Sequence, residues 1–64
     1  MEGFYRALAA ILLENGWSVV RPGKGSHEIW SDPTGAASVA VPRTVKSRHT
    51  ANGILKQAGL PKAF

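Results

Sequence analysis

Residues 26–41, which read SHEIWSDPTGAASVAV, form the centre of the predicted fold. They contain two short runs of strand-favouring residues, 26–31 and 37–41, and Pro42 ends the second run because proline cannot donate to a β-ladder. Between the runs, the segment 32–35 (Asp-Pro-Thr-Gly) has proline and glycine where a tight turn requires them. The pattern predicts a β-hairpin.

Toward the N-terminus, the sequence predicts a further strand and, before it, a helix. The β-favouring residues of 17–20 are closed by the loop 22–25, Pro-Gly-Lys-Gly. A helix of about three turns is expected ahead of residues 15–16, Asn-Gly, which can adopt the left-handed conformation that ends a helix. Its apolar stripe has the spacing i, i+4, i+7 and i+8 and consists of Phe4, Leu8, Ile11 and Leu12.

Toward the C-terminus, the sequence predicts a polar loop and a second helix. Residues 43–49 are polar and basic and are expected to form the loop. Ser47 or Thr50 could cap the start of the helix, and residues 59–61, Gly-Leu-Pro, form a typical helix stop. The apolar stripe of this helix consists of Ala51, Ile54, Leu55 and Ala58.

The predicted element order is therefore α-β-β-β-α. Three strands joined by short turns form an antiparallel meander, and two amphipathic helices must bury their stripes on one face of it. We expect a two-layer α+β domain that spans residues 1–64 and leaves the other sheet face open. A domain of this size buries only about 60% of the surface that its unfolded chain exposes, so its stability is marginal.

The composition excludes several classes of site. The chain has no cysteine, so no disulfide or thiolate zinc site can form, and a reducing, cytoplasmic location is expected. The longest apolar run, residues 7–13, is too short to span a bilayer, so no membrane partner is expected. A chain of 64 residues leaves no room for a separate cofactor domain, and no cofactor is expected.

The distribution of charge favours a polyanionic partner. The net charge is +4, and all four acids lie in the first half of the chain: Glu2, Glu14, Glu28 and Asp32. From Pro33 onward there are no acids but five basic residues, Arg43, Lys46, Arg48, Lys56 and Lys62. Such asymmetry suggests a polyanionic partner and modestly favours nucleic acid, although small domains are often basic for solubility alone.

The segment 23–27, Gly-Lys-Gly-Ser-His, is the strongest candidate for chemistry. Its glycines allow a ligand to approach the backbone closely, and Lys24 adds a positive charge. His27 can accept a proton from a ribose 2′-hydroxyl or donate one to a leaving oxygen. We therefore take His27 as the catalytic candidate, and Lys24, Gly25 and Ser26 as its phosphate-binding neighbours. The alternative is an ordinary hairpin connection with a surface histidine.

The basic residues after the last strand are candidates for phosphate contacts. If RNA is the ligand, Arg43, Lys46 and Arg48 form a patch that contacts its backbone; otherwise they are a solvated run of charge. His49 lies among them, and we expect it to be a solvated loop residue rather than a partner acid.

No metal site is expected. The chain has only two histidines and four acids, and His27 and Glu28, as neighbours on a strand, point to opposite faces. Among the aromatic residues, Trp17 is expected in the core. Trp30 alternates with Ile29, so if Ile29 is buried, Trp30 is exposed and would contact RNA or a protein partner.

Three segments together resemble the HicA family of bacterial toxins. They are 25–30 (Gly-Ser-His-Glu-Ile-Trp), 39–42 (Val-Ala-Val-Pro) and 54–60 (Ile-Leu-Lys-Gln-Ala-Gly-Leu), with Thr50 ahead of the last. The likeness runs from the first helix to Leu60. It implies a double-stranded-RNA-binding-domain-like fold and the toxin of a type II toxin–antitoxin system. It also implies that the chain is an mRNA interferase that acts independently of the ribosome, with its catalytic histidine at position 27.

The resemblance also implies a protein partner. HicA toxins are neutralised by a HicB antitoxin, which binds the toxin and hides the histidine, so a hetero-oligomer with such an antitoxin is expected. With mRNA as substrate, the predicted activity is that of a metal-independent endoribonuclease. A non-catalytic RNA-binding module of the same fold is the alternative. A degenerate toxin that only contacts a partner protein is a third hypothesis.

Overall fold

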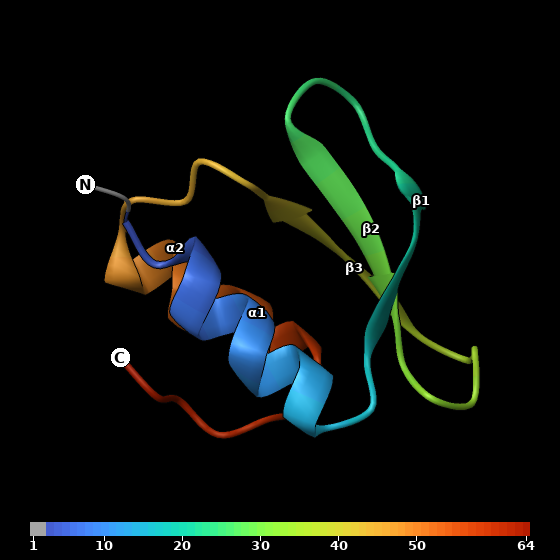
Figure 1. Cartoon of the computed structure of the whole chain (residues 1–64). Helices are drawn as coiled ribbons and strands as arrows, with labels where there is room; N and C mark the ends of the chain where they lie inside the picture. Colours follow the sequence, from blue (N-terminus) through green and yellow to red (C-terminus); the bar gives the residue numbers. More distant parts are fainter. Residues whose placement is uncertain (1–2) are drawn as a thin grey trace.

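The computed structural model describes residues 3–64 and has the predicted element order, α-β-β-β-α (Figure 1). The strands form one antiparallel sheet in the order β1-β2-β3, which is the expected meander. Both helices lie on the same side of this sheet, which confirms the two-layer α+β class. The elements are α1 (Tyr5–Glu14), β1 (Ser18–Pro22), β2 (His27–Ser31), β3 (Ser38–Pro42) and α2 (Arg48–Gln57).

The register of β2 decides which of its side chains the helices cover. Successive side chains of a strand point to opposite faces. Glu28 and Trp30 face the helices, as do their partners on β3, Val41 and Val39. Ile29 and the exposed His27 alternate with them and lie on the open face. The candidate histidine is therefore not covered by the helical layer.

The core lies between the sheet and the two helices. Both predicted helical stripes contribute to it, which confirms their assignment, and Trp17 is buried as expected. The buried apolar residues are Leu8, Leu12, Trp17, Trp30, Val39, Val41, Val45, Ala51, Ile54 and Leu55.

The expectation of an exposed Trp30 is wrong. Trp30 exposes only 2% of its surface, whereas Ile29 is half-buried on the open face. Burial of the larger indole removes more apolar surface from water. The indole N–H also has a partner, because Nε1 donates to Glu28 Oε1 at 3.2 Å. A buried tryptophan requires such a partner for its polar end, and Glu28 on the same face provides it.

The segment between β3 and α2 is shorter than predicted. The expected loop 43–49 overlaps the helix, since α2 begins at Arg48. Of the two predicted caps, Ser47 is the one used, and its hydroxyl accepts the His49 backbone N–H at 3.1 Å. Within the loop, Val45 is buried, and its carbonyl accepts the Phe4 backbone N–H at 2.9 Å. The basic segment is thereby attached to the start of α1.

β1 is the least covered strand of the sheet. Its pairing with β2 shifts register between Val19 and Arg21, so Val20 forms a β-bulge. All five residues of β1 are exposed, in contrast to β3, where exposed and buried positions alternate before Pro42. The strand is also longer than the predicted run 17–20, because it extends to Pro22.

Residues 63–64 are held against the helices by one side chain. Asn52 Oδ1 accepts the backbone N–H groups of Ala63, at 3.3 Å, and Phe64, at 2.9 Å, and Asn52 Nδ2 donates to the Phe64 carbonyl at 3.3 Å. The ring of Phe64 meets that of Phe4 edge to face, with 5.3 Å between centroids. This contact adds an aromatic pair at the margin of the core.

Candidate functional site

His27 is exposed at the start of β2, and its ring has a defined hydrogen-bond partner. Nδ1 lies 3.1 Å from the carbonyl oxygen of Lys24, which also accepts the His27 backbone N–H at 3.1 Å. A carbonyl oxygen can only accept, so the ring contact is made by an Nδ1–H donor. The neutral ring then carries its lone pair on Nε2, which is the nitrogen available to take a proton.

The β1–β2 loop packs closely against this histidine. The Gly23 backbone N–H donates to the His27 carbonyl at 2.9 Å. A Cβ atom at position 23 would lie 3.2 Å from both His27 Cβ and Ile29 Cδ1. Gly25 has φ +62°, a left-handed conformation that favours glycine. A side chain at position 23 would therefore be in tight contact with both His27 and Ile29.

A groove of about 370 Å³ opens beside His27. The Arg43 backbone N–H donates to the Ser26 carbonyl at 3.0 Å, which holds the end of β3 against the loop. Two arginines and one imidazole thus line a single hollow, and guanidinium groups are well suited to bind phosphate. The lining residues are Val19, Val20, Arg21, Pro22, Gly25, His27, Glu28 and Arg43.

Glu28 is the acidic residue of the groove, and its carboxylate is already engaged. Oε1 accepts the Tyr5 hydroxyl at 2.6 Å as well as the Trp30 indole N–H at 3.2 Å. The hydrogen bond to Glu28, then desolvation and the negative charge of that carboxylate, raise the pKa of Tyr5, while the charge of Arg43 acts to lower it. Glu28 ties α1 to β2, which leaves the His27 imidazole as the exposed proton acceptor of the groove.

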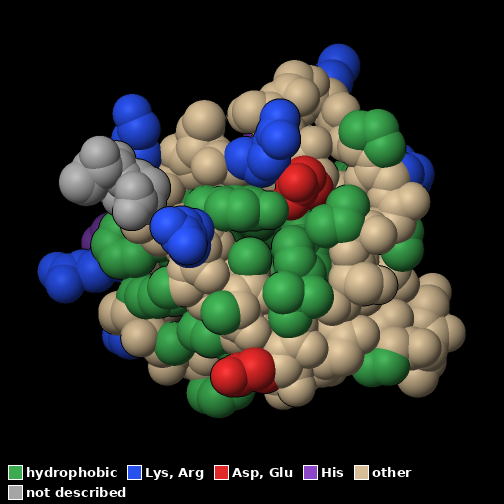
Figure 2. Space-filling model, viewed as in Figure 1, with side chains coloured by type: hydrophobic (Ala, Val, Ile, Leu, Met, Phe, Trp, Pro, Cys, Tyr) green, Lys and Arg blue, Asp and Glu red, His purple; other side chains and the backbone are tan. Residues whose placement is uncertain are grey.

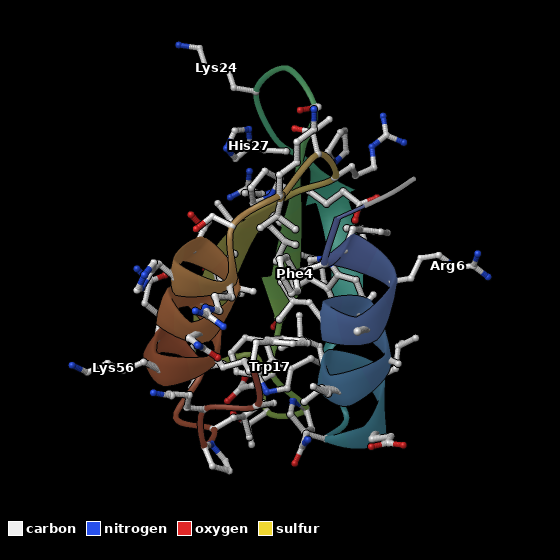
Figure 3. All side chains as sticks on the ribbon, turned by 90° about the vertical axis from the view of Figure 1, so that its left-hand side faces the viewer. Phe4, Arg6, Trp17, Lys24, His27 and Lys56 are labelled. Atoms are coloured by element: carbon white, nitrogen blue, oxygen red, sulfur yellow. The ribbon has the colours of Figure 1, made fainter. Side chains whose placement is uncertain are left out.

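The residues predicted from the sequence fall into two groups. Gly25, His27 and Arg43 line the groove together. Ser26 lies outside the lining and contributes its carbonyl to Arg43. The Lys24 side chain projects away from the loop into solvent (Figure 3). Three further exposed residues lie outside the groove lining: Lys46 precedes α2, and Arg48 and His49 are in its first turn.

Sequence reasoning missed Arg21. This residue pairs with Ile29 across the sheet, so it shares the open face with His27 and lines the groove. Strand alternation could have found it if the register of the hairpin had been known. The bulge at Val20 changes the phase of β1, and nothing in the sequence Val-Val-Arg-Pro indicates a bulge.

The exposed surface of the molecule is rich in basic side chains. All eight Lys and Arg side chains are exposed, and Figure 2 shows such side chains along the upper and left margins of the face in view. Among residues 3–64, no group of three or more His, Asp or Glu side chains could hold a metal ion. The helices of this part of the chain are too short and too polar to cross a membrane.

Residues 5–60, nearly the whole chain, match a family of toxins from bacterial toxin–antitoxin systems. The protein is thus the toxin component of such a pair. Its family is HicA toxin, to which the chain belongs, as the sequence resemblance implied. No curated protein and no solved structure matches the chain. The likeness of this fold to the double-stranded-RNA-binding domain therefore stays a prediction.

Proposed function

We propose that this toxin is an mRNA endonuclease that requires neither the ribosome nor a metal ion and that uses His27 as its catalytic residue. The observation that carries the proposal is the exposed imidazole in a groove that is also lined by two arginines. Membership of a toxin family supports a damaging activity, and the basic surface supports RNA as its target. The unit that carries the activity is a single toxin domain, residues 1–64.

In the proposed reaction, Nε2 of His27 takes the proton of a ribose 2′-hydroxyl, and the 2′-oxygen attacks the adjacent phosphorus. A bond forms between the 2′-oxygen and phosphorus, and the bond from phosphorus to the 5′-oxygen breaks. The leaving 5′-oxygen takes a proton from the imidazolium or from water. Because RNA supplies the nucleophile, the chemistry needs no metal, and its products are a 2′,3′-cyclic phosphate and a 5′-hydroxyl.

The positive groups around His27 have two proposed roles. Arg21 and Arg43, which line the groove, stabilise the negative charge that develops on the phosphate in the transition state. The β1–β2 loop and the region from Lys46 to the first turn of α2 hold the RNA backbone on either side of the cleaved bond, through charge and through backbone N–H groups. The residues with this second role are Lys24, Gly25, Ser26, Lys46 and Arg48.

A HicB-type antitoxin is the proposed protein partner. Membership of the family implies a toxin–antitoxin pairing, and the exposure of His27 leaves a site that a bound protein can cover. The proposed complex is a cytoplasmic hetero-oligomer in which the antitoxin closes the groove and keeps RNA out.

Replacement of the two histidines separately tests the catalytic assignment. His27→Ala should abolish growth arrest on induced expression and lower cleavage of labelled RNA by at least about a hundredfold, the usual contribution of a positioned acid or base. His49→Ala is the matched control, because His49 is exposed and lies outside the groove lining. Full toxicity of the His27→Ala protein would refute the assignment.

The chemistry of the substrate separates cleavage from binding. An RNA in which every 2′-hydroxyl is replaced by hydrogen should bind but remain intact, and EDTA should not slow cleavage of normal RNA. Loss of activity on chelation would show that a metal takes part. If the purified chain binds labelled mRNA in a salt-dependent manner and never cuts it, the chain is a non-catalytic RNA-binding module instead.

A further inference from the structure

β1 is one of the two edge strands of this sheet, and its side chains are the more exposed. The order β1-β2-β3 places β1 at an edge, and Figure 1 shows α2 at a distance from this strand. Val19 and Val20 expose 46% and 55% of their surface. An edge strand presents unpaired N–H and C=O groups, and apolar side chains beside them favour pairing with another chain. This edge thus combines unpaired main-chain groups with exposed apolar side chains, which together favour the addition of a strand.

The charges near this edge distinguish between two kinds of partner. Arg21 is exposed on β1, Lys24 is exposed in the loop that follows, and Arg43 lies across the groove. A second copy of the chain, with its own charge of +4, would bring like charges together, and charges on edge strands oppose self-pairing in this way. A strand rich in Asp and Glu would meet the same charges favourably.

The geometry points to the free edge of β1 as the docking site for an extended, acidic segment of a partner protein, which adds to the sheet as a fourth strand. Main-chain hydrogen bonds provide the affinity in this mode of binding, and alternate side chains provide the specificity. The apolar side chains of the segment contact Val19 and Val20, and its carboxylates face Arg21. The occupant is a polypeptide because an RNA strand cannot form the β-ladder.

The consequence for activity follows from the position of β1 and rests on the proposed function. Four consecutive residues of β1 form one wall of the groove that contains His27: Val19, Val20, Arg21 and Pro22. A fourth strand along this wall narrows the entrance and neutralises Arg21. Binding of the segment should therefore inhibit RNA cleavage.

The first test uses the intact chain and a displayed library of short random peptides, with no RNA present. We expect the enriched peptides to alternate acidic with apolar residues and to slow hydrogen exchange at β1 amides. Methylation of alternate peptide nitrogens should abolish binding, because it removes the ladder hydrogen bonds. Failure to enrich any peptide, enrichment of peptides without acidic residues, or protection elsewhere in the sheet would each overturn the inference.

Charge variants give the second test. Arg21→Gln should weaken binding of the best peptide by up to about fivefold, as expected for one exposed ion pair. Lys56→Gln is the matched control, since Lys56 projects from α2 into solvent (Figure 3), and it should leave the affinity unchanged. If both variants lost the same amount of peptide affinity, net charge alone would explain the loss, and the inferred docking site on β1 would be overturned. A concentration-dependent dimer of the chain that protects β1 amides from hydrogen exchange would also overturn the inference.

The two proposals can fail separately. Peptide binding is measured without RNA, so it is unaffected if the chain proves unable to cleave RNA. If cleavage occurs, the selected peptide should slow it in proportion to its occupancy. A peptide that protects β1 while cleavage continues at the full rate would overturn the inhibitory role. Protection of β1 amides by RNA, but by none of the peptides, would assign this edge to the nucleic acid.

Discussion

Replacement of Tyr5 by phenylalanine removes one hydroxyl and its 2.6 Å hydrogen bond to Glu28 Oε1. A hydrogen bond to a charged group contributes about 1.5–3 kcal/mol to stability when buried, and partial exposure of this pair reduces the expected loss to about 1 kcal/mol. For a domain of this size, such a loss lowers Tm by about 4–8 °C. Thermal unfolding followed by circular dichroism near neutral pH measures the difference.

The same hydrogen bond makes the stability depend on alkaline pH. The pKa of Tyr5 is raised above its ordinary value of 10.0, first by the hydrogen bond to Glu28 and then by desolvation and by the charge of that carboxylate. A raised pKa means that the folded state favours the neutral phenol. Its contribution is therefore fully present below pH 10.0 and is lost as the pH rises through the folded-state pKa. The Tyr5→Phe protein should lack this loss.

Tyr5 is the only tyrosine of the chain, so its ionisation can be followed directly by phenolate absorbance. The native protein should titrate at a higher pH than the protein in denaturant, and Glu28→Gln should move the native value toward 10.0. A native pKa equal to or below the denatured one would refute the contact. Such a result would also remove the tie between α1 and the wall of the groove.

Three further predictions concern other parts of the fold. Gly53→Ala should stabilise the chain by about 1 kcal/mol, because Gly53 is inside α2 and an added Cβ would meet nothing within 4 Å; a lower midpoint in urea would contradict it. Asn52→Ala should lower Tm by a few degrees, about 1 kcal/mol, because it removes all three hydrogen bonds to residues 63–64; an unchanged Tm would argue against this anchor. Desolvation acts to raise the pKa of Asp32, but hydrogen bonds from Ala37 and Thr34 outweigh it and hold the pKa below its ordinary value. This carboxylate thus stabilises the fold above pH 3.8, with loss as the pH falls through the folded-state pKa, and Asp32→Asn should flatten the acid limb of an unfolding-against-pH curve; a limb as steep as in the unmodified chain would count against it.

The element order could be predicted from the sequence because each element has a local signal. The helical stripes repeat at the helical period, and the turn at 32–35 has its own hydrogen bonds, with Thr34 Oγ1 donating to Asp32. No local signal in the sequence indicates which face of the sheet a given strand residue occupies. In β2 the sequence could not distinguish burial of Ile29 from burial of Trp30, because both are large and apolar and they alternate along the strand.

The sequence pointed to His27 as a candidate, but it did not indicate which other residues line the groove with it. His27 follows a glycine-rich loop, which is a signal in the sequence itself. Arg21 joins it only through the strand register, and Tyr5 contacts the groove residue Glu28 from a helix whose packing angle no local pattern specifies. Lys46 and Arg48 share a basic run with Arg43, but the turn after β3 separates them from the groove. Proximity along the chain could not indicate that, of this basic run, Arg43 alone lines the groove.

The missing side chain at Gly23 offers a way to grade the potency of this toxin. A methyl group there would lie 3.2 Å from His27 Cβ, so we expect Gly23→Ala to shift His27 by a few tenths of an ångström while the imidazole is retained. If the proposed catalytic role of His27 is correct, this variant should cleave RNA more slowly while it retains the imidazole.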